Sequence, residues 1–379
     1  MTGHVRPRAV RGFRGAASGS LTSGARTYAS SVNVGYVDLA SEYIYDPGFR
    51  RLPILVLMHG YGEDLDDIAT PLRHRMARRG WFVLAPGMRG RNGASGARDA
   101  SGREIQDIID AVEDVRGGFA SVVDPGRVAI VGYSGGGGNA LAAIAKAPDY
   151  WTAAVAHFGP SDYGWRSDSG WYYTDPSFQA ALTTDVGATP SAQPGWWRSR
   201  NHADALGYQL ALAPRGSGPR LWLYHDADDP TVDVAQSDRV RDVLDAAGLT
   251  ELYSYGRSTS QDATRYLHGY PEGSYGLEVA EGEWWEAAIN ADTWAVPASG
   301  AALVAGFIRT RRFSVWLGTT TGGANPRLDP VGGTVHVARL RWSGATFDLL
   351  PLTGALRYRI DMGALTVTGD TSDPITVTL

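Results

Sequence analysis

The chain has 379 residues, 43% of them hydrophobic, and a formal net charge of -5. This length allows one large hydrophobic core and a smaller second module. The negative balance supplies no dense basic surface, so we expect no nucleic-acid partner. Cysteine is absent, which excludes disulfides, thiolate metal sites and a cysteine nucleophile.

The first segment carries several arginines but no apolar run of the length that a secretory signal needs. We therefore expect residues 1–33 to form a flexible or loosely docked arm. No window approaches the roughly 18 consecutive apolar residues of a membrane span, so we expect none. These observations leave the cellular compartment open.

Strand and helix patterns alternate along most of the chain. The apolar run Leu52–Gly60 is typical of a strand buried on both faces, and residues 67–80 show the apolar spacing of a helix. Further strands are expected at 81–87, 127–132, 151–159, 219–226 and 250–256, and helices at 102–117, 139–146, 234–248 and 281–296. This order predicts an α/β fold with a doubly wound, mostly parallel sheet. Ligands of such sheets bind beyond the carboxyl ends of the strands.

One serine stands at such a strand end. The segment Gly132-Tyr133-Ser134-Gly135-Gly136 matches G-x-S-x-G, whose glycines permit a strained strand-to-helix turn that exposes the serine oxygen. The alternative is a glycine-rich turn that cradles phosphate, but the chain has no G-x-x-x-x-G-K-[ST] segment. We therefore predict that Ser134 is a nucleophile.

A nucleophilic serine needs a base, usually a histidine that a carboxylate orients. When the partners follow in the order serine, acid, histidine, His268 is the best-placed base, because it lies in a loop after the last expected strand of the sheet. The acid is expected in the turn after residue 225, where four candidates compete: Asp226, Asp228, Asp229 and Asp233.

Several segments resemble α/β-hydrolases. The turn "HDADDPTV" resembles their acid turn and places Asp229 in the acid position, and "MHGYGED" resembles their oxyanion loop. The resemblance implies that the amides of Tyr61 and Gly135 form the oxyanion hole. The segments "GPSDYG", "RNHADAL" and "GWFVLAPGMRGRNG" are similar to the catalytic domains of prolyl-oligopeptidase-type and dienelactone-hydrolase-type enzymes. We accordingly expect an α/β-hydrolase domain at 34–299.

Aromatic residues are concentrated where the alternation breaks, at about 161–218, which we expect to form a loop-rich cap over the active site. Aromatic walls suit acyl groups, aromatic esters and sugar faces. Our candidate substrate-binding residues are Trp165, Trp171, Tyr133, Trp196, Trp197 and Tyr270. The alternative is that the rings of the insertion pack against their own domain.

The pattern changes after Pro297–Gly300 to short alternating segments separated by turn residues. Residues 300–379 are therefore expected to form a small all-β domain, either a β-sandwich or a β-barrel. An accessory, substrate-binding or assembly role is open for this domain.

These features together predict a serine hydrolase that cleaves carboxylic ester bonds of a small molecule or a polymer through an acyl-enzyme, with no metal or organic cofactor. The first alternative is a serine peptidase of the oligopeptidase type. The second is a binding or phage-tail structural protein that keeps the hydrolase scaffold without turnover.

Overall fold

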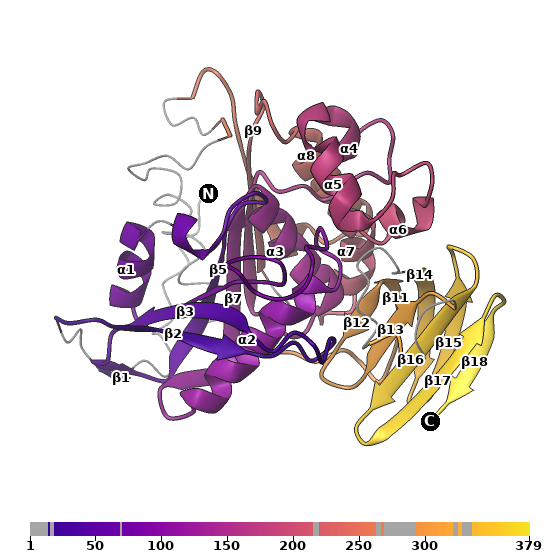
Figure 1. Cartoon of the computed structure of the whole chain (residues 1–379), viewed down its shortest axis with the longest axis horizontal. Helices are drawn as coiled ribbons and strands as arrows, with labels where there is room; N and C mark the ends of the chain where they lie inside the picture. Colours follow the sequence, from indigo (N-terminus) through magenta and orange to yellow (C-terminus); the bar gives the residue numbers. More distant parts are fainter. Residues whose placement is uncertain are drawn as a thin grey trace, which may run out of the picture.

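The computed structural model describes residues 14–15, 19–68, 70–214, 220–262, 267–268, 288, 291, 293–320, 325–327 and 336–379. These residues form a large sheet with helices on both faces, a helical cap, and a second sheet at the C-terminal end (Figure 1). The expected helix at 281–296, with Trp284 and Trp285, lies almost entirely outside the described residues.

The large sheet has eight strands in the order β10-β9-β8-β7-β5-β6-β3-β2. Its strands are β2 (Thr22–Tyr28), β3 (Leu39–Tyr45), β5 (Leu52–Met58), β6 (Phe82–Pro86), β7 (Val123–Tyr133), β8 (Ala153–His157), β9 (Arg220–Asp226) and β10 (Tyr253–Ser258). All pairings from β6 to β10 are parallel, whereas β3 pairs antiparallel with β6 and with β2. A mostly parallel, doubly wound sheet is therefore confirmed.

The N-terminal edge of this sheet corrects one expectation. β2 lies inside the segment 1–33 that we expected to be an arm, yet it pairs with β3 over its whole length. Its side chains alternate between half-buried and exposed positions, and only Tyr28 is buried. This short, polar edge strand lacks the apolar run by which the central strands are recognised. A further short pair joins β1 (Arg14–Gly15) to β4 (Phe49–Arg50).

The central strands are apolar throughout because both faces of the sheet are covered. In β5, Ile54 and Val56 belong to one hydrophobic cluster and Leu55 and Leu57 to another, on the opposite face. One face is packed by α1 (Thr70–Arg78) and the other by α2 (Glu104–Gly118), α3 (Gly135–Lys146), α7 (His202–Leu210) and α8 (Ala235–Ala246). Single 3-10 turns lie at η1 (Leu65–Asp67) and η3 (Thr250–Leu252).

The cap is an insertion between β8 and β9. It contains α4 (Trp171–Thr174), η2 (Pro176–Phe178), α5 (Gln179–Val186) and α6 (Pro194–Arg198), which lie above α7 in Figure 1. Buried Trp171, Leu182, Val186 and Trp197 give the cap a hydrophobic core that also contains Tyr61. The cap therefore packs directly on the loop after β5.

The C-terminal strands form one antiparallel sheet in the order β17-β16-β13-β12-β11-β14-β15-β18. They are β11 (Ser299–Ala305), β12 (Phe307–Arg309), β13 (Ser314–Gly318), β14 (Val337–Ser343), β15 (Thr346–Pro351), β16 (Leu356–Met362), β17 (Leu365–Thr371) and β18 (Ile375–Thr378). β17 and β18 are open edges, so the closed barrel that we considered is wrong for this sheet. Apolar side chains from β11 to β16 and from β18 share one core.

This second sheet packs against the helices of the first through buried polar bonds as well as apolar contacts. The Gln209 amide nitrogen donates to the carbonyl oxygens of Ala145, at 2.9 Å, and Leu303, at 2.7 Å. The Lys146 ammonium donates to the Ala305 carbonyl and lies 5.3 Å from the centre of the Phe307 ring. Gln209 and Lys146 thus link the carboxyl end of α3 to the C-terminal sheet.

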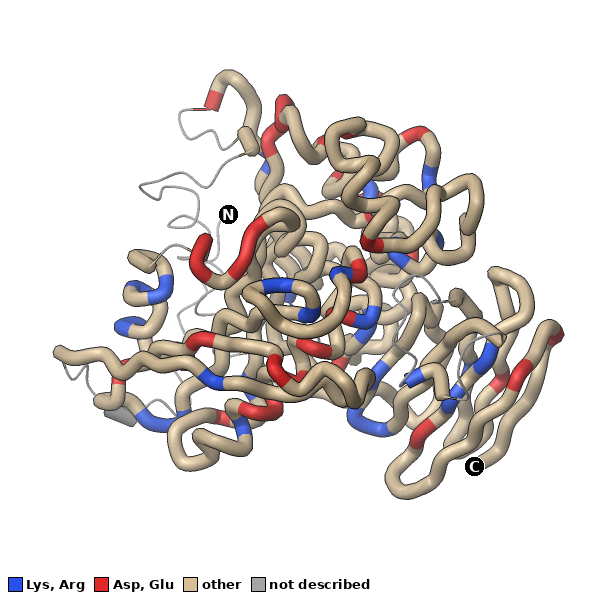
Figure 2. Tube along the Cα trace, viewed as in Figure 1, with Lys and Arg blue, Asp and Glu red and all other residues tan. Residues whose placement is uncertain are grey.

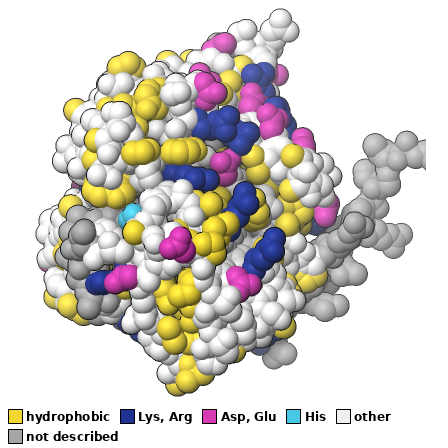
Figure 3. All heavy atoms as spheres, turned by 90° about the vertical axis from the view of Figure 1, so that its right-hand side faces the viewer, with side chains coloured by type: hydrophobic (Ala, Val, Ile, Leu, Met, Phe, Trp, Pro, Cys, Tyr) yellow, Lys and Arg dark blue, Asp and Glu magenta, His cyan; other side chains and the backbone are white. Residues whose placement is uncertain are grey.

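Charges of both signs are spread over the two parts of the molecule (Figure 2). The side formed by the cap and the C-terminal sheet likewise carries basic and acidic groups interspersed with hydrophobic ones (Figure 3). Within the described ranges, every helix is too short or too polar to cross a bilayer.

Lys146 makes the docking of the C-terminal sheet sensitive to pH. Burial and the nearby charge of Arg200 lower the pKa of its ammonium to about 7. The unfolded chain therefore binds more protons than the folded chain between pH 7 and the ordinary lysine pKa, so stability rises with pH in that window. We expect the free energy of unfolding to rise by about 2–3 kcal/mol between pH 7 and 9.5 in urea titrations. Lys146→Met should flatten this rise, and equal slopes in the two proteins would contradict the assignment.

Candidate active site

Ser134 lies at the sharp turn between β7 and α3. Its backbone has φ 51° and ψ -127°, and its N–H donates to the His157 carbonyl at 3.0 Å. A positive φ is costly for a residue with a Cβ, and it persists only where the surroundings hold it. The turn places the side chain beyond the carboxyl end of a central strand, in front of a helix N-terminus.

Two glycines of the turn are required by close packing. A Cβ at Gly132 would lie 2.1 Å from the Gly136 carbonyl oxygen, and one at Gly135 would lie 2.5 Å from the Tyr61 amide nitrogen. Neither contact tolerates a side chain. The glycine-rich motif thus brings the start of α3 against the loop after β5.

The structure brings Ser134, His268 and Asp229 together. His268 Nε2 lies 3.0 Å from Ser134 Oγ, and His268 Nδ1 lies 2.9 Å from Asp229 Oδ2. In this orientation Nδ1 donates to the carboxylate and Nε2 accepts from the hydroxyl. The three side chains are within direct hydrogen-bond distance of one another in sequence, which is the arrangement that activates a serine in known hydrolases.

Asp229 is held as an ionised carboxylate. Its Oδ1 accepts the amides of Thr231 and Val232 at 2.8 and 2.9 Å, and its side chain is fully enclosed. Burial acts to raise its pKa, but hydrogen bonds from His225 and His268 outweigh burial and lower the pKa to about 2. The carboxylate is therefore ionised at neutral pH and accepts the Nδ1 proton of His268 in a hydrogen bond.

The other acids of the turn have different partners. Asp226 is buried and accepts the Asp228 amide and the Ser258 hydroxyl. Asp228 is exposed, and Asp233 accepts the Ala235 amide at the start of α8. Asp229 alone among these four carboxylates contacts His268 in the described structure.

The amides of Tyr61 and Gly135 lie where the loop after β5 meets the start of α3, because Gly135 packs on the backbone of Tyr61. Within the described part of the chain neither amide donates to another group. Two free backbone donors beside a nucleophile suit the stabilisation of an oxyanion.

Three side chains hold the loop that carries Tyr61, and our sequence reasoning identified none of them. The Glu63 carboxylate accepts the Gly60 amide at 2.7 Å and the Tyr133 hydroxyl. Asp185, on the cap helix α5, accepts the Tyr61 hydroxyl, and Arg91 donates to the Tyr61 carbonyl at 2.8 Å. Arg91 and Asp185 lie far from Tyr61 along the chain, so no sequence signal links them to it, whereas Glu63 stands only two residues after Tyr61.

Phe158 packs beside His268, and our sequence reasoning missed this contact as well. Its ring centre lies 4.8 Å from that of His268, and its backbone has a φ of 37°. A left-handed conformation at an aromatic residue is rare. Together with Ser134, it concentrates backbone strain around the same reacting groups.

The cap corrects part of the expected substrate pocket. Trp171 and Trp197 are fully buried, and their indole nitrogens donate to the carbonyls of Thr231 and Ala188, each at 3.0 Å. Their rings form the core of the cap and are not available to a substrate. The interpretation that the aromatic residues pack the insertion itself applies to these two.

The remaining aromatic candidates lie in other settings. Tyr133 is half-buried beside Ser134, and Trp196 is half-buried against the core of the cap. Trp165 is 36% exposed, with the Arg198 guanidinium 5.2 Å from its ring centre. Tyr270 lies outside the described residues.

His59 and His157 are buried in the structure. Burial lowers the pKa of both His59 and His157 to about 4, so both rings are neutral at physiological pH. His59 Nδ1 lies 2.8 Å from the Gly60 carbonyl, and the His157 ring stacks on Tyr224. The described residues contain no cluster of three or more histidine or acidic side chains that could hold a metal ion.

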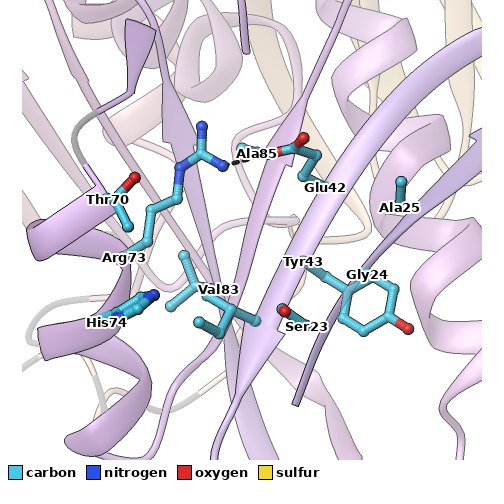
Figure 4. A pocket seen from close by; sticks show the side chains of 11 residues that line it. Ser23, Gly24, Ala25, Glu42, Tyr43, Thr70, Arg73, His74, Val83 and Ala85 are labelled. Atoms are coloured by element: carbon cyan, nitrogen blue, oxygen red, sulfur yellow. Dashed lines mark hydrogen bonds and ion pairs between the residues drawn. The ribbon is translucent and has the colours of Figure 1, made fainter. Parts of the chain in front are cut away.

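A separate cavity of about 340 Å³ lies between α1 and the strands β2, β3 and β6 (Figure 4). Its charged groups are already paired, since Arg73 binds Glu42 and the Leu65 carbonyl. Neither Ser134 nor His268 lines this cavity, so it is distinct from the candidate active site.

Comparison with known proteins agrees with this geometry. A family model described as X-Pro dipeptidyl-peptidase (S15 family) matches residues 37–259. The chain is 29% identical over 194 residues to the quorum-quenching protein AidA of Acinetobacter baumannii (strain MDR-ZJ06), a match that covers 47% of this chain and 62% of that protein.

Solved structures give the same fold. A puromycin-hydrolyzing peptidase of Mycobacterium tuberculosis superposes with a TM-score of 0.55 and 22% identity, over 72% of this chain and 40% of that one. An acylaminoacyl peptidase of Pyrococcus horikoshii superposes with a TM-score of 0.52 and 18% identity, over 64% and 37% of the two chains. The expected α/β-hydrolase fold is confirmed.

The bond between Tyr61 and Asp185 should couple the cap to the oxyanion loop energetically. Burial is the main cause that raises the pKa of Asp185, so this carboxylate depends on the Tyr61 hydroxyl as its donor. In a double-mutant cycle of Tyr61→Phe and Asp185→Ala, we expect a coupling energy of about 1–2 kcal/mol by urea unfolding. The matched cycle of Tyr61→Phe with Thr184→Ala, an exposed neighbour on α5, should be additive. Additivity in both cycles would show that the bond contributes nothing.

Proposed function

We propose, from the premise that this chain belongs to the X-Pro dipeptidyl-peptidase (S15) family and is a serine hydrolase, that it cleaves carboxylic esters with Ser134, His268 and Asp229 as its catalytic triad. The observation that carries the proposal is the continuous hydrogen-bonded path from Asp229 through His268 to Ser134. The strained turn at Ser134 supports it independently.

The reaction follows from the roles of these groups. His268 Nε2 takes the proton of Ser134 Oγ as that oxygen attacks the ester carbonyl, and the amides of Tyr61 and Gly135 bind the oxygen that becomes negative. His268 then gives the proton to the departing alcohol, which leaves an acyl-enzyme. Water, activated by the same histidine, releases the acid and restores Ser134.

Ester cleavage is the first choice because an alcohol is a better leaving group than an amine. Ester cleavage requires the triad and the two oxyanion amides, whereas a dipeptidyl-peptidase also requires groups that bind the amino end of the peptide. The C-terminal sheet is proposed to be an accessory domain that buttresses α3, the helix that follows Ser134.

Peptide cleavage is the second candidate, and one observation favours it. Glu63 is a half-buried carboxylate beside the oxyanion loop, linked to the hydroxyl of the residue before Ser134. An acidic group at this place suits a substrate with a positively charged amine. The family to which the chain belongs is named for such peptidases.

The triad is tested by Ser134→Ala and Asp229→Asn. We expect Ser134→Ala to abolish labelling by a fluorophosphonate probe and to lower the kcat for p-nitrophenyl acetate by at least about 10³-fold. Asp229→Asn should lower kcat by roughly 10³–10⁴-fold, because the amide no longer favours the required tautomer of His268. Ser191→Ala and Asp233→Asn, at exposed positions, are the matched controls and should keep wild-type rates. Full activity of Ser134→Ala would end the proposal.

Substrate assays with the wild-type protein distinguish cleavage of ester bonds from cleavage of amide bonds. Turnover of short p-nitrophenyl esters without turnover of aminoacyl or prolyl anilides supports the esterase. Anilide cleavage that Glu63→Gln weakens more strongly than it weakens ester cleavage supports the peptidase, because loss of the Gly60 bond alone affects both reactions.

A further inference from the structure

Arg91 is a buried cation behind the oxyanion loop. Its side chain is 3% exposed, and its Nη1 donates to the Tyr61 carbonyl at 2.8 Å and lies 3.5 Å from the Glu63 carbonyl. The buried arginines Arg89 and Arg200 each pair with an aspartate. Among the described residues, Arg91 has no carboxylate partner within the 4 Å of an ion pair.

A buried charge without a counterion is costly, because the protein interior solvates it poorly. The field of Arg91 does reach Glu104 and Asp185, where it opposes the burial that raises the pKa of both carboxyls. Both of these acids have their own donors, namely the amides of Asp99 and Ser101 for Glu104 and the Tyr61 hydroxyl for Asp185. The loop carbonyls are thus the direct partners of Arg91.

The Arg91 guanidinium contacts Tyr61, the residue whose amide forms one side of the proposed oxyanion hole. It bonds the carbonyl of Tyr61, and the amide of the same residue packs against Gly135 beside Ser134. A positive charge that is fixed before the reaction in an enclosed site stabilises negative charge without having to reorganise.

We propose that Arg91 is a positioning residue of the oxyanion hole, which orients the Tyr61 amide and stabilises, through its charge, the oxyanion that forms during acyl transfer. This inference rests on the proposed function of Ser134. Because the negative charge exists only in the transition state and the tetrahedral intermediate, the effect belongs to kcat and not to substrate binding.

The test separates charge from hydrogen bonding. Arg91→Gln keeps a donor for the Tyr61 carbonyl but removes the charge, whereas Arg91→Lys keeps the charge. The measurements are kcat and KM for p-nitrophenyl acetate and the Ki of an aryl trifluoromethyl ketone, whose adduct with the serine bears an oxyanion. Arg339→Gln, at an exposed position on β14, is the matched control.

In Arg91→Gln we expect kcat to fall about 10- to 100-fold, KM to stay within about twofold, and the Ki of the ketone to rise by the same factor as kcat falls. Arg91→Lys should stay within about threefold of the wild type, and Arg339→Gln should match it. Wild-type kcat and Ki in Arg91→Gln would overturn the inference. So would an Arg91→Lys that is folded by circular dichroism yet impaired more than about tenfold in both.

Where Arg91→Gln does not fold, Arg91→Lys still tests the inference, because impairment of more than about tenfold in both kcat and Ki overturns it. If the proposed function is wrong, the wild-type protein itself shows no fluorophosphonate label at Ser134 and no ester turnover. If only the inference about Arg91 is wrong, the wild-type protein shows both.

Discussion

The first turn of α3 packs backbone against backbone between two loops, and the geometry of the site depends on this contact. A Cβ at Gly136 would lie 2.5 Å from the His59 carbonyl, and one at Gly137 would lie 2.7 Å from the His157 carbonyl. Because the turn carries no side chains there, α3 approaches the ends of β5 and β8 closely. That approach sets Ser134 between the loop of Tyr61 and the strand end at His157, within reach of His268.

Neighbouring residues fix the side chains of the proposed triad and the loop of Tyr61. Backbone amides fix Asp229, the ring of Phe158 supports His268, and a cap helix holds Tyr61 through Asp185. A site of this kind is organised before substrate arrives, which is where electrostatic catalysis gains its advantage. The left-handed backbone of Ser134 and Phe158 is the conformational cost of that organisation.

Local motifs made the central residues predictable. The G-x-S-x-G segment, the order of serine, acid and histidine, and the turn around Asp229 each depend on a few neighbouring residues or on chain order. The strands buried on both faces were equally predictable, because the apolar run at Leu52–Met58 reflects burial on both sides of the sheet. The edge strand β2 was not, since an edge needs no such run.

Long-range packing escaped sequence reasoning. Trp171 and Trp197 look like pocket residues in the sequence, but whether an indole faces solvent or the core depends on how the cap helices meet. The contacts of Arg91, Asp185 and Phe158 join elements that are far apart in the chain, so no residue spacing in the sequence predicts them. The open C-terminal sheet differs from a barrel only in whether β17 meets β18, which strand patterns do not encode.

Lys146 has a practical consequence for solution work. It is the one lysine of the chain and is fully buried under the C-terminal sheet. Lysine-directed crosslinkers and dyes will therefore find no side-chain amine on the folded surface, and mapping of neighbours in solution will need carboxyl- or arginine-directed reagents. The same side chain becomes a built-in reporter, since modification at Lys146 marks molecules in which the C-terminal sheet has detached from α3.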